Sequence, residues 1–468
     1  MKLELYDNAL EENVSNDYKV ELLIDDRIEE VKCFHAVVRR ELYDETTVAK
    51  PGTVDLFEGR TTYLPKMSYC RFSCTFDQPL KIRVKPLKEF NFIRIRPGKI
   101  NYKIINGVIE FVLAKPSKLS IEIDGNLFEN LFLFAEESEN DIPQLEDKNV
   151  ITFKKGVHVL QDDLLLGSGQ TLYLEPGSFV YGCVRAIGEN IKIVGKGILC
   201  GSKLNHDVAL PRKQLLKASH CENLLIKDIF MIDSPTWTLM VYDCKNVVID
   251  NVKQISWNEN GDGIDICKSE NVEVKNVFLR NSDDNISIKS RKYPDNENLY
   301  GFSCQNIYVH DSIFWADKAH CMLVGPEATM GQKSEFKNIR FENIVCLEHC
   351  EFMNEYQGVM AIFSADESVI DNVLWKNIEI YNTSFGRLIS IKYTSVFAAA
   401  IGKEVKNIQY ENIKYYGNQI FPDIIFGHDE EHIIENVTIK DMYVSGIKQT
   451  EKYNGIRMNG YTKNIQFI

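Results

Sequence analysis

Three aspartates in the middle of the chain have the residue type and spacing that acid–base chemistry requires. Asp262 lies between two glycines, and the adjacent pair Asp283 and Asp284 follows 21 and 22 residues later. If the fold brings these groups together, repulsion between like charges raises the pKa of one carboxyl group, so that it keeps its proton near neutral pH. Such a pairing suits glycosidic bond cleavage, because one acid protonates the leaving oxygen while another carboxylate activates water or attacks carbon.

An internal repeat surrounds these acids. Its unit is Asn, apolar, any, apolar, any, then Asn or Asp and an apolar residue; copies start at Asn223, Asn246, Asn271, Asn338, Asn372, Asn407 and Asn436, and looser ones at Asn190, Asn306 and Asn464. Helical arrays need a 3.6-residue period and leucine-rich repeats a leucine frame, and these β-branched heptads have neither. The repeat therefore predicts a right-handed parallel β-helix, whose coils stack on one another. An Asn or Asp at the sixth place tolerates a left-handed turn, and stacked asparagines can hydrogen-bond along the axis.

The repeat gives each acid a position within its coil. Counted from the first asparagine of its own coil, Asp262 is 16 residues on, Asp283 and Asp284 are 12 and 13 on, and His320 is 14 on. Adjacent parallel strands lie about 4.8 Å apart, so we expect these side chains to gather on neighbouring strands. A lone acidic pair is more often a solvated turn, but acids on adjacent coils favour a functional site. The spacing alone allows a retaining or an inverting mechanism.

The first part of the chain has a different pattern. From residue 1 to about 134, short segments of alternating apolar and polar residues are separated by turns, which is typical of an antiparallel sandwich. The stretch AEESENDIPQLEDKN at 135–149 is acidic and contains a proline, as interdomain linkers do. We therefore predict an all-β chain with an antiparallel β-sandwich domain over 1–147 and a β-helix domain over 148–468.

Composition excludes several classes of partner. The net charge of −13 argues against nucleic-acid and anionic-membrane partners, which need clustered basic residues. No uncharged run reaches the ~18 residues of a membrane span, and the first residues lack a signal-peptide pattern, so we expect a cytoplasmic protein, or a secreted one if the sequence is a mature form. The twelve cysteines lack zinc-ligand spacing and are expected to be reduced and buried. No metal or cofactor is predicted, and the oligomeric state is left open.

The acidic motifs resemble those of the polygalacturonase clan of glycoside hydrolases, families 28 and 49. The family 28 pattern is Asn-Thr-Asp, Asp-Asp, Gly-His-Gly and Arg-Ile-Lys. Here NGD at 260–262 matches the first with Gly261 in place of Thr, and DDNISIKS at 283–290 matches the second closely. AHCMLVG at 319–325 resembles the third, with Ala319 and Cys321 in place of the glycines. The fourth motif is absent from the expected region, and GRLISIKY, with Arg387 and Lys392, lies too far downstream to replace it. The resemblance covers about residues 150–440.

This resemblance implies hydrolysis with inversion. Asp283 would be the general acid, Asp262 and Asp284 would hold the attacking water, and His320 would support the acid or the sugar. In the pectin-cleaving members the basic pair binds a galacturonate carboxylate, so its absence favours a neutral, α-glucan-like glycan. The N-terminal sandwich points the same way, because it resembles the layout of family 49, which includes dextranases. A polygalacturonase-type pectin hydrolase is the alternative.

Six more residues are predicted to contact the carbohydrate substrate together with His320: Asn260, Trp257, Lys289, Arg291, Glu355 and Tyr356. They flank the acids or lie in the polar insertion 347–358, where irregular loops build cleft walls. Trp257 could stack on a sugar ring or pack in the core.

Two other functions remain open. A polysaccharide lyase would use the three aspartates to bind calcium and would need a basic residue as its base. A non-catalytic carbohydrate-binding rod would keep the repeat without needing the acids.

Overall fold

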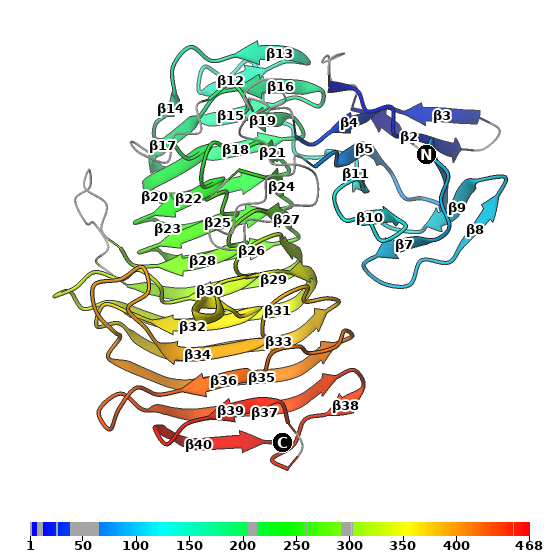
Figure 1. Ribbon diagram of the computed structural model, residues 1–468. Helices are drawn as coiled ribbons and strands as arrows, with labels where there is room; N and C mark the ends of the chain where they lie inside the picture. Colours follow the sequence, from blue (N-terminus) through cyan, green and yellow to red (C-terminus); the bar gives the residue numbers. More distant parts are fainter. Residues whose placement is uncertain are drawn as a thin grey trace, which may run out of the picture.

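The computed structural model describes residues 2–6, 13–24, 27–37, 65–204, 213–258, 260–291, 301, 303–452 and 454–468. Within these ranges nearly every regular element is a β-strand, and the strands form two smaller sheets beside a long coiled one (Figure 1). The predicted all-β fold, a right-handed parallel β-helix preceded by a β-sandwich, is confirmed.

The sandwich consists of a six-stranded and a five-stranded sheet. The first contains β1 (Leu3–Leu5), β4 (Cys33–His35), β5 (Ser68–Cys74), β7 (Ile93–Arg96), β10 (Ser117–Ile123) and β11 (Leu131–Glu137). The second contains β2 (Tyr18–Ile24), β3 (Arg27–Val31), β6 (Leu80–Pro86), β8 (Tyr102–Ile105) and β9 (Val108–Leu113). Alternating buried and exposed residues along β2 and β6 line the core between the sheets. Among the described strand pairs of the sandwich only β5 and β11 are parallel, so the six-stranded sheet is mixed rather than purely antiparallel.

The β-helix has three parallel sheets. The repeat sheet contains β12 (Val150–Phe153), β15 (Thr171–Leu174), β18 (Lys192–Gly195), β23 (Lys245–Asp250), β26 (Glu270–Lys275) and β40 (Thr462–Phe467), and the asparagine heptads lie on it from β18 onward. The sandwich-facing sheet contains β13 (Gly156–Val159), β16 (Ser178–Tyr181), β19 (Ile198–Cys200), β21 (Phe230–Ile232), β24 (Lys253–Ser256) and β27 (Phe278–Asn281). The site sheet contains β14 (Leu164–Leu166), β17 (Val184–Glu189), β22 (Leu239–Tyr242), β25 (Ile264–Cys267), β28 (Ile286–Lys289), β30 (Met322–Val324), β32 (Met360–Ser364), β34 (Ile389–Tyr393), β36 (Asp423–Phe426) and β39 (Ile456–Met458).

Longer strands continue from one sheet into the next. These are β20 (Leu216–Lys227), β29 (Cys304–Ala316), β31 (Glu335–His349), β33 (Val369–Ile380), β35 (Glu404–Tyr415) and β37 (Ile434–Val444). The short β38 (Ile447–Lys448) pairs antiparallel with β37, and one 3-10 helix, η2 (Asn354–Tyr356), follows β31. A continuous core of stacked aliphatic residues runs inside the coils, so each coil is stabilised by its neighbours.

The asparagines stabilise the coils as the repeat predicts. Asn246 and Asn271 both have a backbone φ of 56°, in the left-handed region. The Nδ2 atom of Asn246 donates to Oδ1 of Asn223 at 3.2 Å, and Asn271 donates to Asn246 at 3.0 Å, so the side chains form a ladder along the axis. The sixth place also adopts positive φ, for example at Asn276.

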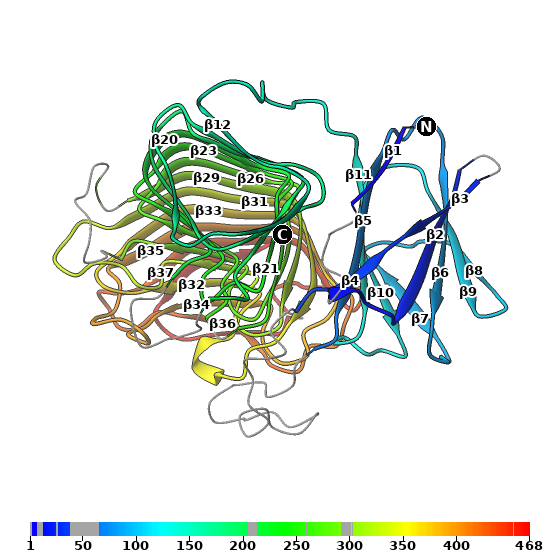
Figure 2. The ribbon, with the colours of Figure 1, turned by 90° about the horizontal axis from the view of Figure 1, so that it is seen from above.

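An aromatic interface joins the sandwich to the β-helix. Figure 2 shows the sandwich alongside one flank of the coils. Phe132 and Phe134 of β11 contact Phe278 of β27 edge-on, with ring centroids 5.2 and 5.1 Å apart. These residues belong to a buried cluster shared by both parts, so the six-stranded sheet is covered on both faces.

All twelve cysteines are free thiols, and eleven of them are buried, as the sequence predicts. No helix in the described ranges is long and apolar enough to cross a bilayer.

Candidate active site

The site sheet brings the motif residues together. Ile264, Ile286 and Met322 are in register on β25, β28 and β30. Asp262, Asp284 and His320 each lie two residues before one of these positions, so they occupy equivalent places on three successive coils. One carboxylate oxygen from each of Asp262, Asp283 and Asp284 lies within 4.8 Å of the others. The stacked coils therefore bring the three aspartates together, as the repeat predicts.

The glycines on either side of Asp262 are required by the closeness of the coils. A Cβ atom at Gly263 would lie 2.4 Å from the backbone oxygen of Asn285, and one at Gly261 would lie 2.7 Å from Oγ of Ser282, both on the next coil. The Gly263 backbone N donates to the Asp284 carbonyl oxygen at 2.7 Å. Small residues at these places therefore let two acidic coils meet directly.

Asp284 and His320 form a buried ion pair. The Nδ1 atom of His320 lies 2.7 Å from Oδ1 of Asp284, and the His320 backbone N donates to the same oxygen at 3.0 Å. Its Nε2 atom faces the carbonyl oxygen of Tyr356, so both ring nitrogens have acceptors, as an imidazolium requires. Burial opposes ionisation of Asp284, but the His320 charge and hydrogen bonds outweigh it and lower the pKa. Burial likewise opposes the His320 charge, and Asp284 outweighs it and raises the pKa.

Asp283 is shifted in the opposite direction. Burial, followed by repulsion from Asp284, raises the pKa of Asp283 to about 6. Its Oδ1 atom accepts a hydrogen bond from the Asp284 backbone N at 2.9 Å. Adjacent carboxyl groups with opposite pKa shifts provide a proton donor beside an ionised carboxylate.

Asp262 shares a buried lysine with two acids that lie outside the motifs. The Lys289 ammonium is 3.2 Å from Oδ2 of Asp262, 2.9 Å from Oδ1 of Asp265 and 3.5 Å from Oε1 of Glu327. Burial and then the Asp265 charge raise the pKa of Asp262, and burial raises the pKa of Asp265 to about 7. Lys289, which we expected to contact substrate, is 3% exposed and acts here as a counter-ion.

Glu351 is a carboxyl group that the motifs did not reveal. It is buried, and its Oε1 atom accepts a hydrogen bond from the Met353 backbone N at 2.6 Å. Burial raises its pKa to about 7, with His320 opposing and Asp283 adding to the shift. In the sequence, Glu351 is one of several acids in the polar insertion 347–358, and nothing distinguishes it from the others. The turn before η2 places its carboxyl group near Asp283 and His320.

Of the other predicted contacts, Tyr356 lies closest to the motif residues. Its ring is edge-on to that of His320, with centroids 4.7 Å apart. Asn260 lies in the turn before Asp262 with a left-handed φ of 52°, and Glu355 is exposed on η2.

Arg291 and Trp257 are placed elsewhere. The Arg291 guanidinium pairs with Glu327 at 3.0 Å and is 57% exposed, at the opposite end of β28 from the acids. Trp257 is 7% exposed and packs edge-on against Phe128 of the sandwich, with centroids 5.5 Å apart. Trp257 therefore belongs to the domain interface, because the coil turns its side chain toward the sandwich.

Within the described ranges, the coils after His320 carry no free basic pair at the places equivalent to His320. By register, the equivalent place on the next coil is Gly358, and Arg387 occupies it one coil further on. The Arg387 guanidinium donates to the carbonyl oxygens of Asn354 and Pro422 at 3.1 and 2.9 Å. Lys392 donates to the carbonyl oxygen of Glu355. Both basic residues thus hold the η2 segment in place.

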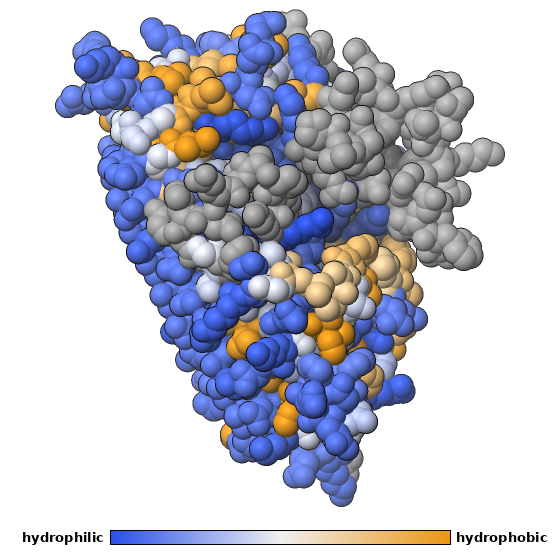
Figure 3. Space-filling view, turned by 90° about the vertical axis from the view of Figure 1, so that its left-hand side faces the viewer, coloured by the Kyte–Doolittle hydropathy of each residue, from blue (hydrophilic) through white to orange (hydrophobic). Residues whose placement is uncertain are grey.

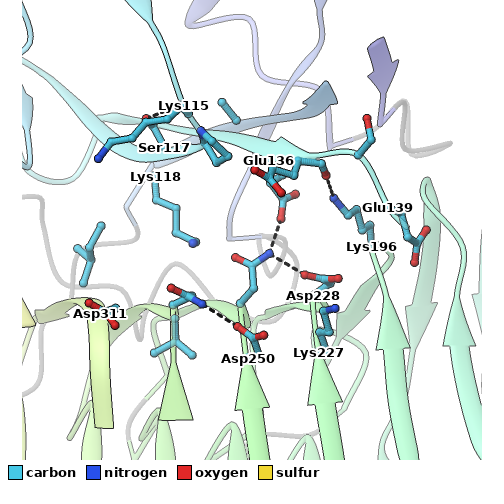
Figure 4. Close-up of a pocket in the computed structure, with 18 of the residues that line it drawn as sticks. Lys115, Ser117, Lys118, Glu136, Glu139, Lys196, Lys227, Asp228, Asp250 and Asp311 are labelled. Atoms are coloured by element: carbon cyan, nitrogen blue, oxygen red, sulfur yellow. Dashed lines mark hydrogen bonds between the residues drawn. The ribbon is translucent and has the colours of Figure 1, made fainter. Parts of the chain in front are cut away.

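A large cavity of about 1350 Å³ lies away from these acids, between the sandwich and the β-helix (Figure 4). Lys118 points into it from the sandwich, and Asp228, which follows β20, and Asp250, the last residue of β23, line it from the β-helix. Asp262, Asp283 and Asp284 do not line it, so this cavity is separate from the site.

Comparisons with known proteins agree with the motifs. Residues 199–462 match the family model described as glycosyl hydrolases family 28. Exopolygalacturonase B of Aspergillus niger is 23% identical over 340 residues, which cover 64% of this chain and 72% of that protein.

Solved structures share the fold at low sequence identity. Dex49A from Penicillium minioluteum superposes with a TM-score of 0.68 at 13% identity, over 99% of this chain and 96% of that one. The family 28 exopolygalacturonase of Yersinia enterocolitica gives 0.50 at 12% identity, over 76% and 85%. Because the family model spans more than half of the chain, this protein belongs to glycosyl hydrolases family 28 and is a glycoside hydrolase.

Proposed function

We propose that this enzyme hydrolyses a glycosidic bond with inversion, using Asp283 as the general acid. The observation that carries the proposal is the cluster of three carboxyl groups, each with one oxygen within 4.8 Å of the others. Asp283 gives its proton to the leaving glycosidic oxygen. A water molecule between Asp262 and Asp284 loses a proton to a carboxylate and attacks the anomeric carbon. His320 keeps Asp284 ionised through the ion pair at 2.7 Å.

Inversion is the part of this mechanism that rests on the family resemblance. Carboxyl groups in inverting enzymes are usually about 6.5–9.5 Å apart, and in retaining enzymes about 5–5.5 Å. The oxygens here are closer than the usual inverting separation. Proton NMR of the first-formed product anomer tests this directly: the proposal expects the inverted anomer, and a retained one would contradict it.

For the substrate we propose a pectin-type, galacturonate-containing oligosaccharide. The support comes from the relatives, which are exopolygalacturonases, and they favour this class over the neutral glycan that the sequence suggested. Lys318 lies close enough to Asp283 to oppose the rise in its pKa. None of the ion pairs in the described ranges involves Lys318, so its ammonium, beside Asp283, is available to a galacturonate carboxylate of the substrate.

A neutral glycan is the second candidate, and one observation favours it. The coil after His320 places Gly358 where a basic residue would be needed, and Arg387 is bound to its own η2 segment. Comparing kcat/KM on galacturonate oligosaccharides with that on α-glucan oligosaccharides decides between the two. A clear preference for the neutral series would overturn the pectic assignment.

Replacing Asp283 by Asn tests the assignment of the acid. We expect kcat to fall by about 10²–10⁴-fold, because the leaving oxygen then lacks a proton donor, while substrate binding is retained. Asp141→Asn, at a side chain that is 84% exposed, is the matched control and should keep wild-type activity. A D283N enzyme that cleaves at the wild-type rate would contradict the mechanism.

The same experiment separates the two rival functions. A lyase would release an unsaturated product that absorbs in the ultraviolet and would require calcium. Its base would have to be a lysine or arginine: Lys289 is bound to Asp262 and Asp265, so Lys318, near Asp283, would have to take that role. A non-catalytic rod would bind glycans equally well with and without Asp283 and would cleave none.

A further inference from the structure

A second hollow, of about 560 Å³, lies at the far end of the site sheet from the acids. The acids precede the first residues of β25 and β28, whereas Arg291, Met330 and Phe397 follow the last residues of β28, β30 and β34. These strand ends lie on the left of Figure 1, the side that faces the viewer in Figure 3, where apolar side chains are interspersed among polar ones. The volume is within the range of about 300–1,000 Å³ that is typical of ligand pockets.

Hydrogen bonds between successive turns fix the walls of this hollow. Oδ1 of Asp366 accepts from the backbone N atoms of Ala399 and Ala400 at 2.8 and 3.0 Å. Oε2 of Glu367 accepts from the backbone N of Gly331 at 3.0 Å. The turns after β30, β32 and β34 are thus tied to one another, so the hollow is formed before any ligand binds.

Phe397 is the unusual residue in these walls. Its side chain is 59% exposed, and its backbone φ is 59°, in the left-handed region that bulky residues rarely adopt. Met330, across the hollow, is 50% exposed. A mostly exposed aromatic ring gains little from core packing, and backbone strain of this kind is concentrated at binding and catalytic sites.

Contacts connect this hollow to the acids by two routes. The Tyr356 ring is edge-on to His320 at 4.7 Å and to Phe397 at 5.2 Å, so two ring contacts link the catalytic histidine region to the hollow. On the other side, Glu327 lines the hollow and lies 3.5 Å from the Lys289 ammonium, which binds Asp262.

We propose that this hollow is a subsite for a sugar unit of the substrate away from the cleaved bond, with Phe397 as the stacking surface for its ring. The apolar face of a sugar ring matches an exposed phenyl ring, while Arg291 and Glu327 at the rim offer a donor and an acceptor to its polar groups. This inference rests on the proposed glycoside hydrolysis and adds where a longer substrate lies.

The test compares substrate length in wild-type enzyme and in Phe397→Ala. We expect the wild type to prefer longer oligosaccharides, and the variant to lose about 3- to 10-fold in kcat/KM on the longest substrate and least on the shortest one cleaved. Phe397→Tyr should restore the preference, because it keeps the ring. Phe92→Ala, at a phenylalanine of the sandwich that is 54% exposed, is the matched control and should keep the wild-type ratio.

Thermal unfolding of each variant shows whether the fold is intact. A wild-type enzyme without a length preference, or a folded F397A enzyme with the wild-type ratio, would overturn the subsite. If the wild type cleaves no glycan of either class, the proposed function itself fails and the subsite fails with it.

Discussion

At the scale of residues, the site works through differences between neighbouring carboxyl groups. Asp283 and Asp284 are adjacent in sequence, but Asp283 is half-buried whereas Asp284 is buried and has an imidazolium partner. One neighbour therefore keeps its proton at a pH where the other is ionised. The motif supplies the acids, and His320 supplies the asymmetry.

The pH dependence of kcat/KM follows from this asymmetry. Asp283, the proposed general acid, must be protonated, and its pKa is raised to about 6, so activity should fall about tenfold per pH unit above that value. Asp284 must be ionised, and its lowered pKa keeps it so at mildly acidic pH. A profile of kcat/KM from pH 4 to 9 measures this; a rate that stays constant above pH 7 would exclude Asp283 as the acid.

Glu351→Gln should move the basic limb of that profile to lower pH. The carboxyl groups of Glu351 and Asp283 repel each other, so removing the Glu351 charge makes Asp283 easier to ionise. We expect a shift of about half a pH unit from the loss of this charge. The glutamine keeps an oxygen that can accept from the Met353 backbone N, so the local structure should be retained. An unchanged profile would show that Glu351 does not influence the acid.

At the scale of elements, the coil stack determines where each acid can be. Gly263 and Asp284 lie on successive coils joined by a backbone hydrogen bond of 2.7 Å. No side chain can fit between them, so the acids approach as closely as the strands allow.

Gly263→Ala should therefore damage stability and activity together. The added Cβ would meet the Asn285 carbonyl oxygen at 2.4 Å, and separating the coils should cost roughly 1–3 kcal/mol of unfolding free energy. Gly460→Ala is the control, because a Cβ there meets nothing within 4 Å. Chemical denaturation and initial rates measure both; a G263A enzyme as stable and active as G460A would contradict the close packing.

At the scale of the whole molecule, the sandwich reaches the β-helix behind the site. Arg96, at the end of β7, donates to the Leu347 carbonyl oxygen at 2.7 Å and pairs with Glu348 at 2.9 Å and Glu122 at 2.7 Å. Glu348 directly precedes His349 and lies three residues before Glu351. The sandwich thus supports the strand that leads into the site wall.

Arg96→Met should destabilise the molecule strongly, because the buried Glu348 carboxylate would lose its close cation and Glu122 would keep only the half-exposed Arg94, a cost of about 3–5 kcal/mol. Arg94→Met is the matched control: that side chain is 44% exposed, and its pair with Glu122 should contribute about 1 kcal/mol or less. Denaturant unfolding monitored by fluorescence compares them; equal losses would show that the interdomain ion pair is not the stabilising element.

The sequence by itself determined the β-helix and the motif acids. Each repeat unit spans about one coil, so the residues that form its strands and turns are close together in the sequence and their pattern can be recognised there. Asparagine heptads specify the turns, and the similar offsets of Asp262, Asp284 and His320 within their coils, 16, 13 and 14 residues, predict that they gather on neighbouring strands. The strand register then shows that the three places are equivalent. The sequence also indicated the sandwich through its alternating pattern.

Only the tertiary structure decided which groups share the site. Asp265, Glu327 and Glu351 have no motif, and they join the acids because parallel strands and loop turns place distant residues side by side. Trp257 was expected at the site, but its side chain points to the sandwich. Side-chain direction depends on packing between coils and domains, and no local pattern encodes it.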